Sequence, residues 1–268
     1  MAVDEDDRPP HFEFRIPNFE FIPIPNFEFN IISNFQKTVY FFICAWYNKI
    51  INIFLRFTMI KISNITVMNF ENAIRGARNP MNSWARMDSY YDVDGNYVLG
   101  DNDLGLASRL AKAGSDHRKY LRQVIVSLDI LAPLYWWKEF DTYKVGTVAN
   151  SCSTMHKIQA KEFSRADFSH EKMDEPTLAV LDSIIACLED NRLKFIETKD
   201  KAYWHNMIQL LPTSYNQLRT VTLNYEVLIN IYRARRYHKL DEWKILCAEI
   251  EKLPYAKELI LLREIDDE

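Results

Sequence analysis

The first 58 residues differ in texture from the rest of the chain, and this break most constrains what the chain can fold into. The segment Pro17–Phe21 (PNFEF) recurs as Pro25–Phe29, and His11–Phe14 looks like a third, degraded copy. Prolines at positions 9, 10, 17, 23 and 25 exclude a continuous helix or a central strand. We therefore expect residues 1–58 to be a non-core extension, or an artefact of start-site choice, and residues 59–268 to be one globular domain.

An aromatic and isoleucine-rich run at residues 39–57 raises the question of a membrane anchor. A spanning helix needs roughly 20 mostly apolar residues, and four polar residues interrupt this run: Asn48, Lys49, Asn52 and Arg56. The acidic start also disagrees with a secretory signal. We expect no membrane association.

Composition excludes several function classes. The net charge of −4 gives no basic excess for a nucleic-acid partner. Only six glycines occur, without a GxGxxG or GxxxxGK[ST] motif, and the histidines lack HxxxH or HExxH spacing, so we expect no phosphate loop and no metal site. Four cysteines without a CxxC pair predict reduced, partly buried thiols in the cytoplasm: Cys44, Cys152, Cys187 and Cys247.

The pattern of apolar residues predicts an α+β fold, mostly helical with a small central sheet. Alternation predicts a strand at residues 60–67, and β-branched runs predict strands at 123–130 and 219–223. Apolar residues at helical spacing predict the remaining elements, at about residues 70–77, 102–113, 133–143, 176–188, 203–211, 224–237 and 243–253.

One helical stripe joins polar and apolar residues in an unusual way. Four residues share it: Asn224, Leu228, Ile231 and Arg235. A buried arginine needs an anionic or carbonyl partner. Either Asn224 and Arg235 face a polar ligand, or Arg235 pairs with a local carboxylate such as Glu226 or Asp241.

Two further clusters leave alternatives open. One, at a helix end, either complements the helix dipole or clamps a phosphate: Arg233, Arg235, Arg236, His238 and Lys239. The other either binds a flat ring and phosphate oxygens or is aromatic core followed by a polar turn: Trp136, Trp137, Lys144, Thr147, Asn150, Ser151, Ser153 and Thr154.

The order of these pieces resembles the flavin-dependent thymidylate synthase family, of phage or prophage type. Over residues 104–243, a strand ending in Ala132–Pro133, an aromatic helix and a polar segment precede Leu211–Pro212. The spacing from Pro212 through Asn224 and Asn230 to Arg235 then matches the family without a gap.

The resemblance implies roles for these residues. It assigns Asn224 and Asn230 to the flavin and Arg235 to the nucleotide substrate. Arg219 lies one position from another family arginine, which binds the substrate phosphate. Gln123 stands where the family often has a flavin-contacting histidine.

The family signature RHRxxSxNxxSxR is only partly present. Its counterpart here is residues 143–155 (YKVGTVANSCSTM), in which Asn150 and Ser153 match but all three arginines are missing. The resemblance places Asn150 with the cofactor and Ser153 with the substrate, and Lys144 can replace one lost charge without the bidentate fork of arginine.

The activity implied by the resemblance is methylation of dUMP to dTMP. It needs FAD, with NADPH and methylenetetrahydrofolate as co-substrates, and no protein nucleophile. Family sites lie between subunits, which implies a homotetramer. The alternatives are a non-catalytic nucleotide-binding protein on the same scaffold, or a structural protein that uses residues 1–58 as an interaction arm.

Overall fold

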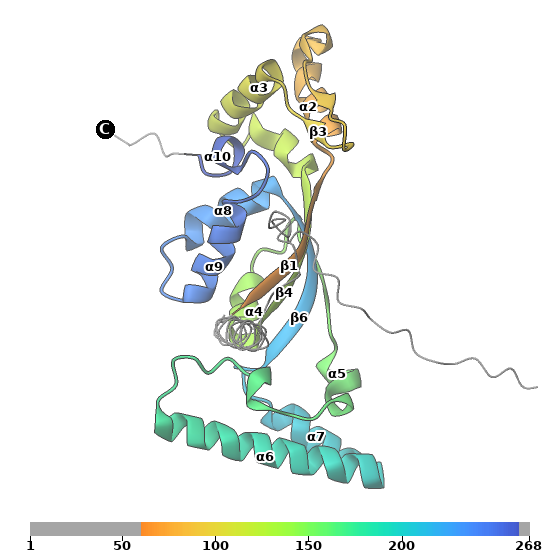
Figure 1. Cartoon of the computed structure of the whole chain (residues 1–268), viewed down its shortest axis with the longest axis vertical. Helices are drawn as coiled ribbons and strands as arrows, with labels where there is room; N and C mark the ends of the chain where they lie inside the picture. The colour runs from red at the N-terminus through yellow and green to blue at the C-terminus, as the bar shows by residue number, and fades with distance from the viewer. Residues whose placement is uncertain (1–59, 263–268) are drawn as a thin grey trace, which may run out of the picture. The chain divides into compact units, whose positions relative to one another are not determined.

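Four antiparallel strands form the sheet that positions the candidate site. The structure is a computed structural model that describes residues 60–262, all within one unit, Ile53–Glu268. The strand order is β1-β4-β6-β5, and Figure 1 shows the three long strands side by side. Their bounds are β1 Lys61–Met68, β4 Ile125–Pro133, β5 Val148–Ser151 and β6 Asn216–Asn224.

One face of the sheet is buried because the strands alternate. In β4, Val126, Leu128 and Ile130 are buried while the residues between them are partly exposed. Helices α8 (Tyr225–Arg235) and α9 (Asp241–Ile250) lie on one side of the sheet in Figure 1. The opposite face is polar, with Thr220 Oγ1 donating to Asp129 Oδ1 at 2.6 Å.

Aromatic residues form the centre of the core. Helix α4 (Leu134–Phe140) presents Trp136, Trp137 and Phe140, each 2% exposed or less, and Trp136 packs on Trp243 of α9 at 4.7 Å between centroids. The tryptophan pair is therefore core, as one of the two interpretations of that cluster predicts.

A group of short elements caps the sheet end where β6 passes into α8. It comprises α2 (Phe70–Arg78), 3-10 helices at Asn79–Met81, Trp84–Arg86 and Arg118–Gln123, strands β2 (Tyr90–Tyr91) and β3 (Tyr97–Val98), α3 (Asp101–Lys112) and α10 (Ala256–Leu259). A buried ion pair, Arg78 Nε to Asp103 Oδ1 at 2.6 Å, ties α2 to α3.

A second apolar cluster lies with the helices near the other end of β6 (Figure 1). Helix α6 (Glu175–Thr198) begins with Asp174 as N-cap and Pro176 in its first turn, and α7 (Lys201–Leu210) packs on it. Helix α5 (Thr154–Lys157) and 3-10 helices at Ile158–Ala160 and Arg165–Asp167 complete this part.

The predicted α+β class is confirmed, and several boundaries are corrected. Gln123 ends a 3-10 helix rather than starting a strand, and β4 runs on to Pro133. Strand β5 was not predicted. Gly100 is the N-cap of α3, and the Asp88 carboxylate accepts from the backbone amides of Asn102 and Asp103 in the first turn of that helix.

Some predictions concern residues outside the described range. These are the extension at residues 1–58, the apolar run at 39–57 within it, and Cys44. Between residues 60 and 262, no helix is long and apolar enough to cross a bilayer. Cys247 is buried, as expected, and burial raises the pKa of its thiol to about 12. Cys152 and Cys187 are exposed, so the prediction of partly buried thiols is wrong for these two.

Candidate functional site

The segment that joins α4 to β5, residues 139–147, contacts three of the residues predicted from sequence. Its first residues complete α4, whose C-cap is Asp141, and it then turns at Gly146, which has a φ of 78°. From there the chain enters β5 at the edge of the sheet. The segment therefore runs from the last turn of α4 to the start of β5, and we call it the 139–147 segment.

Arg235, in the last turn of α8, is held by this segment. Its Nη1 donates to Glu139 Oε2 at 2.9 Å, and its Nε donates to Tyr143 Oη at 3.0 Å. The guanidinium also lies 4.6 Å from the ring centroid of Trp243, whose Nε1 donates to the same Glu139 oxygen at 2.9 Å. The side chain is 18% exposed, so the arginine is fixed in a half-buried position with its charge compensated.

Neither carboxylate expected from sequence is the partner of Arg235. Glu226 instead accepts both its bonds from Arg118 Nε, at 3.0 Å each, and Asp241 pairs with Lys172 and Lys244. Glu226 and Asp241 thus pair with other cations. The helical stripe correctly predicted that Arg235 is partly buried, but the two carboxylates suggested as its partner were wrong.

Arg219 reaches the same segment from the sheet. It lies opposite Ser151 of β5, on the face covered by helices. Its Nη1 donates to Asp141 Oδ1 at 2.8 Å, its Nε donates to Gln217 Oε1 at 3.0 Å, and its guanidinium stacks 4.3 Å from the Trp137 centroid. A second arginine is therefore held by a second carboxylate of the 139–147 region.

Asn224 approaches the other end of the segment. It is the N-cap of α8, where its Oδ1 accepts from Val227 N at 3.1 Å, and the residue is 8% exposed. Its Nδ2 lies 2.8 Å from the point that a Cβ on Gly146 would occupy. Among the described residues Nδ2 has no acceptor, and the buried Oγ1 of Thr147 has no partner. Two polar groups with unused hydrogen-bonding capacity thus lie within this turn.

The other predicted residues of the polar segment are exposed or partly exposed. Lys144 is exposed in the turn, and Asn150 is exposed on β5 opposite Thr220. Ser153 is the N-cap of α5: its Oγ accepts from His156 N at 3.1 Å and lies 2.8 Å from His156 Nδ1. The structure thus places these side chains along one edge of the sheet.

Two predicted residues lie apart from this group. Gln123 borders a shallow hollow of about 360 Å³ with Asn72 and Arg75, where its carbonyl accepts from Asn69 Nδ2 at 2.9 Å. Asn230 is exposed on α8, six residues and about 600° of helix rotation beyond Asn224. The two asparagines therefore lie on different sides of α8.

Sequence reasoning missed the two carboxylates that hold the arginines, Glu139 and Asp141. The signal available in the sequence was the position of both acidic residues at the C-terminal end of an amphipathic helix. A negative charge there interacts unfavourably with the helix dipole and needs a positively charged partner. Within residues 60–262, no three histidine, cysteine or acidic side chains converge in a way that suits a metal ion.

The comparisons with known proteins agree with this geometry at the level of the fold. The chain matches no protein-family model and no curated protein sequence. It is similar in structure to thymidylate synthase X from Helicobacter pylori with FAD and dUMP, at a TM-score of 0.55 and 18% identity, over 76% of this chain and 98% of that one. A second structure of the flavin-dependent enzyme from Helicobacter pylori, complexed with FAD and dUMP, gives a TM-score of 0.54 at the same identity. The fold is therefore that of the flavin-dependent thymidylate synthases.

Proposed function

We propose that this protein binds FAD and a pyrimidine nucleotide and methylates dUMP to dTMP. Methylenetetrahydrofolate would supply the carbon and NADPH the electrons. The observation that supports this most is the 139–147 segment, which forms hydrogen bonds with Arg219 and Arg235 and passes close to Asn224 at Gly146. These are three of the residues to which the resemblance gives ligand roles.

The residues around Gly146 suit FAD. Asn224 Nδ2 is a donor without an acceptor, and the Thr147 hydroxyl is both donor and acceptor without a partner, among the described residues. An isoalloxazine edge carries several carbonyl and ring-nitrogen acceptors that match such groups. When bound, the flavin supplies the redox chemistry, while the chain orients the reacting partners and excludes water.

The two arginines suit an anionic nucleotide. Each uses Nε and Nη1 within the fold, and Nη2 of each has no partner between residues 60 and 262. Glu139 and Asp141 fix the two guanidinium planes before a ligand arrives, so little side-chain entropy is lost on binding. Arg235 would hold the pyrimidine nucleotide and Arg219 its phosphate.

The exposed Asn230 supports a proposed homotetramer. An amide on the outer side of α8 can complete a flavin site only from a neighbouring subunit. Light scattering on the purified protein measures the assembly directly.

A non-catalytic nucleotide-binding protein is the second candidate. The absence of the signature arginines from residues 143–155 favours it. Turnover of dUMP with reduced flavin and methylenetetrahydrofolate separates the two candidates.

Substitution of Arg235 by lysine tests the nucleotide role. Arg235→Lys keeps the charge but loses the planar fork, so we expect dUMP to bind roughly 5- to 150-fold more weakly, the equivalent of about 1–3 kcal/mol. Arg233→Lys, on the exposed side of the same helix, is the matched control. The measurement is calorimetric titration with dUMP beside a thermal melt.

Three results would contradict the proposal. Unchanged dUMP affinity in a destabilised Arg235→Lys variant would show that Arg235 is purely structural. No dUMP binding by the parent protein would end the substrate assignment, and a colourless protein that takes up no FAD would end the flavin assignment.

A further inference from the structure

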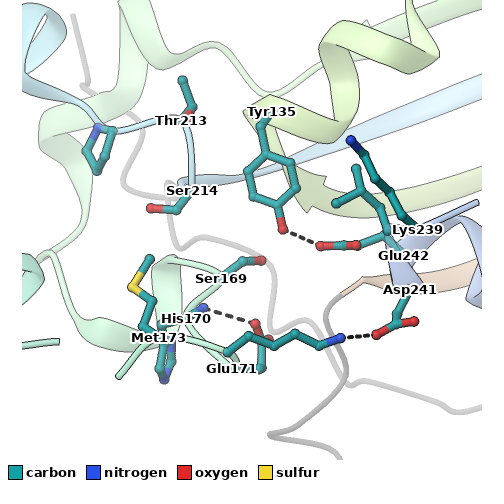
Figure 2. Close-up of a pocket in the computed structure, with 13 residues that line it drawn as sticks. Tyr135, Ser169, His170, Glu171, Met173, Thr213, Ser214, Lys239, Asp241 and Glu242 are labelled. Carbon is teal, nitrogen blue, oxygen red and sulfur yellow. Dashed lines mark hydrogen bonds and ion pairs between the residues drawn. The ribbon is translucent and has the colours of Figure 1, made fainter. Parts of the chain in front are cut away.

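A cavity at the start of α9 lies apart from the residues to which the proposed function gives ligand roles, although Lys239 of the predicted basic cluster lines it. It has a volume of about 520 Å³ and lies between Tyr135 of α4, residues 169–173, residues 212–214 and residues 239–242 (Figure 2). Small-molecule sites in proteins typically enclose roughly 300–1,000 Å³. We call it the α9 cavity.

A buried carboxylate, Glu242, faces this cavity. The residue is 3% exposed, and in Figure 2 its carboxylate points toward Tyr135, whose hydroxyl donates to Oε1. Burial, and then this bond to Glu242, raises the pKa of Tyr135 above its ordinary value, so the phenol stays protonated and remains a donor. Within residues 60–262, the other carboxylate oxygen, Oε2, has no hydrogen-bond donor.

The cations at the rim do not form ion pairs with Glu242. Lys172 Nζ bonds to Asp241, and Lys239 forms no ion pair with the described residues. Glu242 does lie in the first turn of α9, but the helix dipole offsets only a small part of the usual cost of burying a charge without a counter-charge. The cavity therefore holds a buried carboxylate that has one hydrogen-bond donor and no ion-pair partner in the described part of the chain.

We propose that the α9 cavity binds a small organic cation with a flat apolar body, such as an amidine or a protonated amine. An N–H of the cation would donate to Glu242 Oε2. The body would pack against the apolar parts of the wall: the Tyr135 ring, Met173, Pro212 and Leu240. The site is independent of the proposed nucleotide function and shares none of its residues.

Three ring compounds of matched shape test the charge preference. The full chain is titrated with benzamidine, benzamide and benzoate, and binding is followed by calorimetry. We expect benzamidine to bind at least about tenfold more tightly than benzamide, the value of one charge-assisted hydrogen bond, and benzoate to bind no better than benzamide.

Glu242→Gln is expected to remove the preference for benzamidine. Glu251→Gln is the control, because Glu251 also accepts from a tyrosine, Tyr232 at 2.7 Å, but is exposed and lines no part of this cavity. It should keep the preference. Because the Glu242 carboxylate has no full counter-charge, Glu242→Gln should not lower the melting temperature of the empty protein.

Several results would overturn the proposal. In the parent protein, equal binding of the three compounds would overturn it, and so would a preference for benzoate set by Lys172 and Lys239. These two results do not depend on whether the variant folds. A preference that survives in Glu242→Gln, or a lower melting temperature of that variant, would show that the carboxylate is structural.

Discussion

Replacing Gly146 by alanine tests the turn that brings the 139–147 segment against α8. Gly146 and Gly95 have nearly the same φ, 78° and 80°. They differ in surroundings, since a Cβ on Gly95 would meet nothing within 4 Å, whereas one on Gly146 would lie 2.8 Å from Asn224 Nδ2 and 3.4 Å from Val227 Cγ2. Gly95→Ala is therefore a control for backbone strain alone.

The difference between the two variants can be worked out from these contacts. Alanine in the left-handed region costs about 1–2 kcal/mol at either position. At Gly146 the Asn224 amide must also rotate away, and its Oδ1 then loses the N-cap bond to Val227 N, at a further cost of roughly 0.5–2 kcal/mol, typically about 1 kcal/mol. We expect Gly146→Ala to melt roughly 2–4 °C below Gly95→Ala, given the usual effect of 1 kcal/mol at this size.

A double-mutant cycle isolates the contact. Urea unfolding is measured for Gly146→Ala, Asn224→Ala and the double variant, and the extra cost at Gly146 should disappear when Asn224 is already alanine. FAD affinity should fall in Gly146→Ala and stay unchanged in Gly95→Ala. Equal destabilisation by Gly146→Ala and Gly95→Ala, or strict additivity in the cycle, would refute the reasoning.

Two further predictions concern stability. Asp103→Asn leaves the buried Arg78 charge uncompensated and should cost about 3 kcal/mol or more in urea unfolding; a loss below about 1 kcal/mol, the upper end for an exposed pair, would contradict the structure. Burial opposes ionisation of Asp103, but the bonds from Ser89 and Arg78 outweigh it and lower its pKa. The contribution of Asp103 to the free energy of unfolding is therefore present above the ordinary aspartate pKa of about 3.9, and it is lost as pH falls through the lowered pKa. The difference in unfolding free energy between the parent protein and Asp103→Asn should therefore become smaller in acid. Finally, a chain that starts at Met59 should melt within a few degrees of the full chain, and a larger loss would show that residues 1–58 contribute to the core.

Local sequence pattern by itself determined much of the framework. The helix that Pro176 opens and the buried face of α8 each follow from a periodicity that burial imposes on the sequence. The strand at residues 60–67 was predicted from the alternation of residue types alone, since no residue of β1 is buried. Strand β5 escaped prediction because all four of its residues are exposed, so that no apolar alternation marks it. Its hydrogen bonds come from pairing with β6, some 70 residues further along the chain, and no local signal reports such pairing.

The site shows the same division between local and long-range information. The half-buried position of Arg235 follows from its place in the α8 stripe, but its partner, Glu139, is 96 residues away and only packing of α4 beside α8 and α9 brings the two together. The Asp88 cap of α3 and the burial of Glu242 in the α9 cavity arise in the same way. Sequence periodicity reports which face of an element is buried, because burial acts on each residue separately. The tertiary structure decides which charged groups form ion pairs. An ion pair depends on the relative positions of two elements, and the periodicity of each element by itself does not determine those positions.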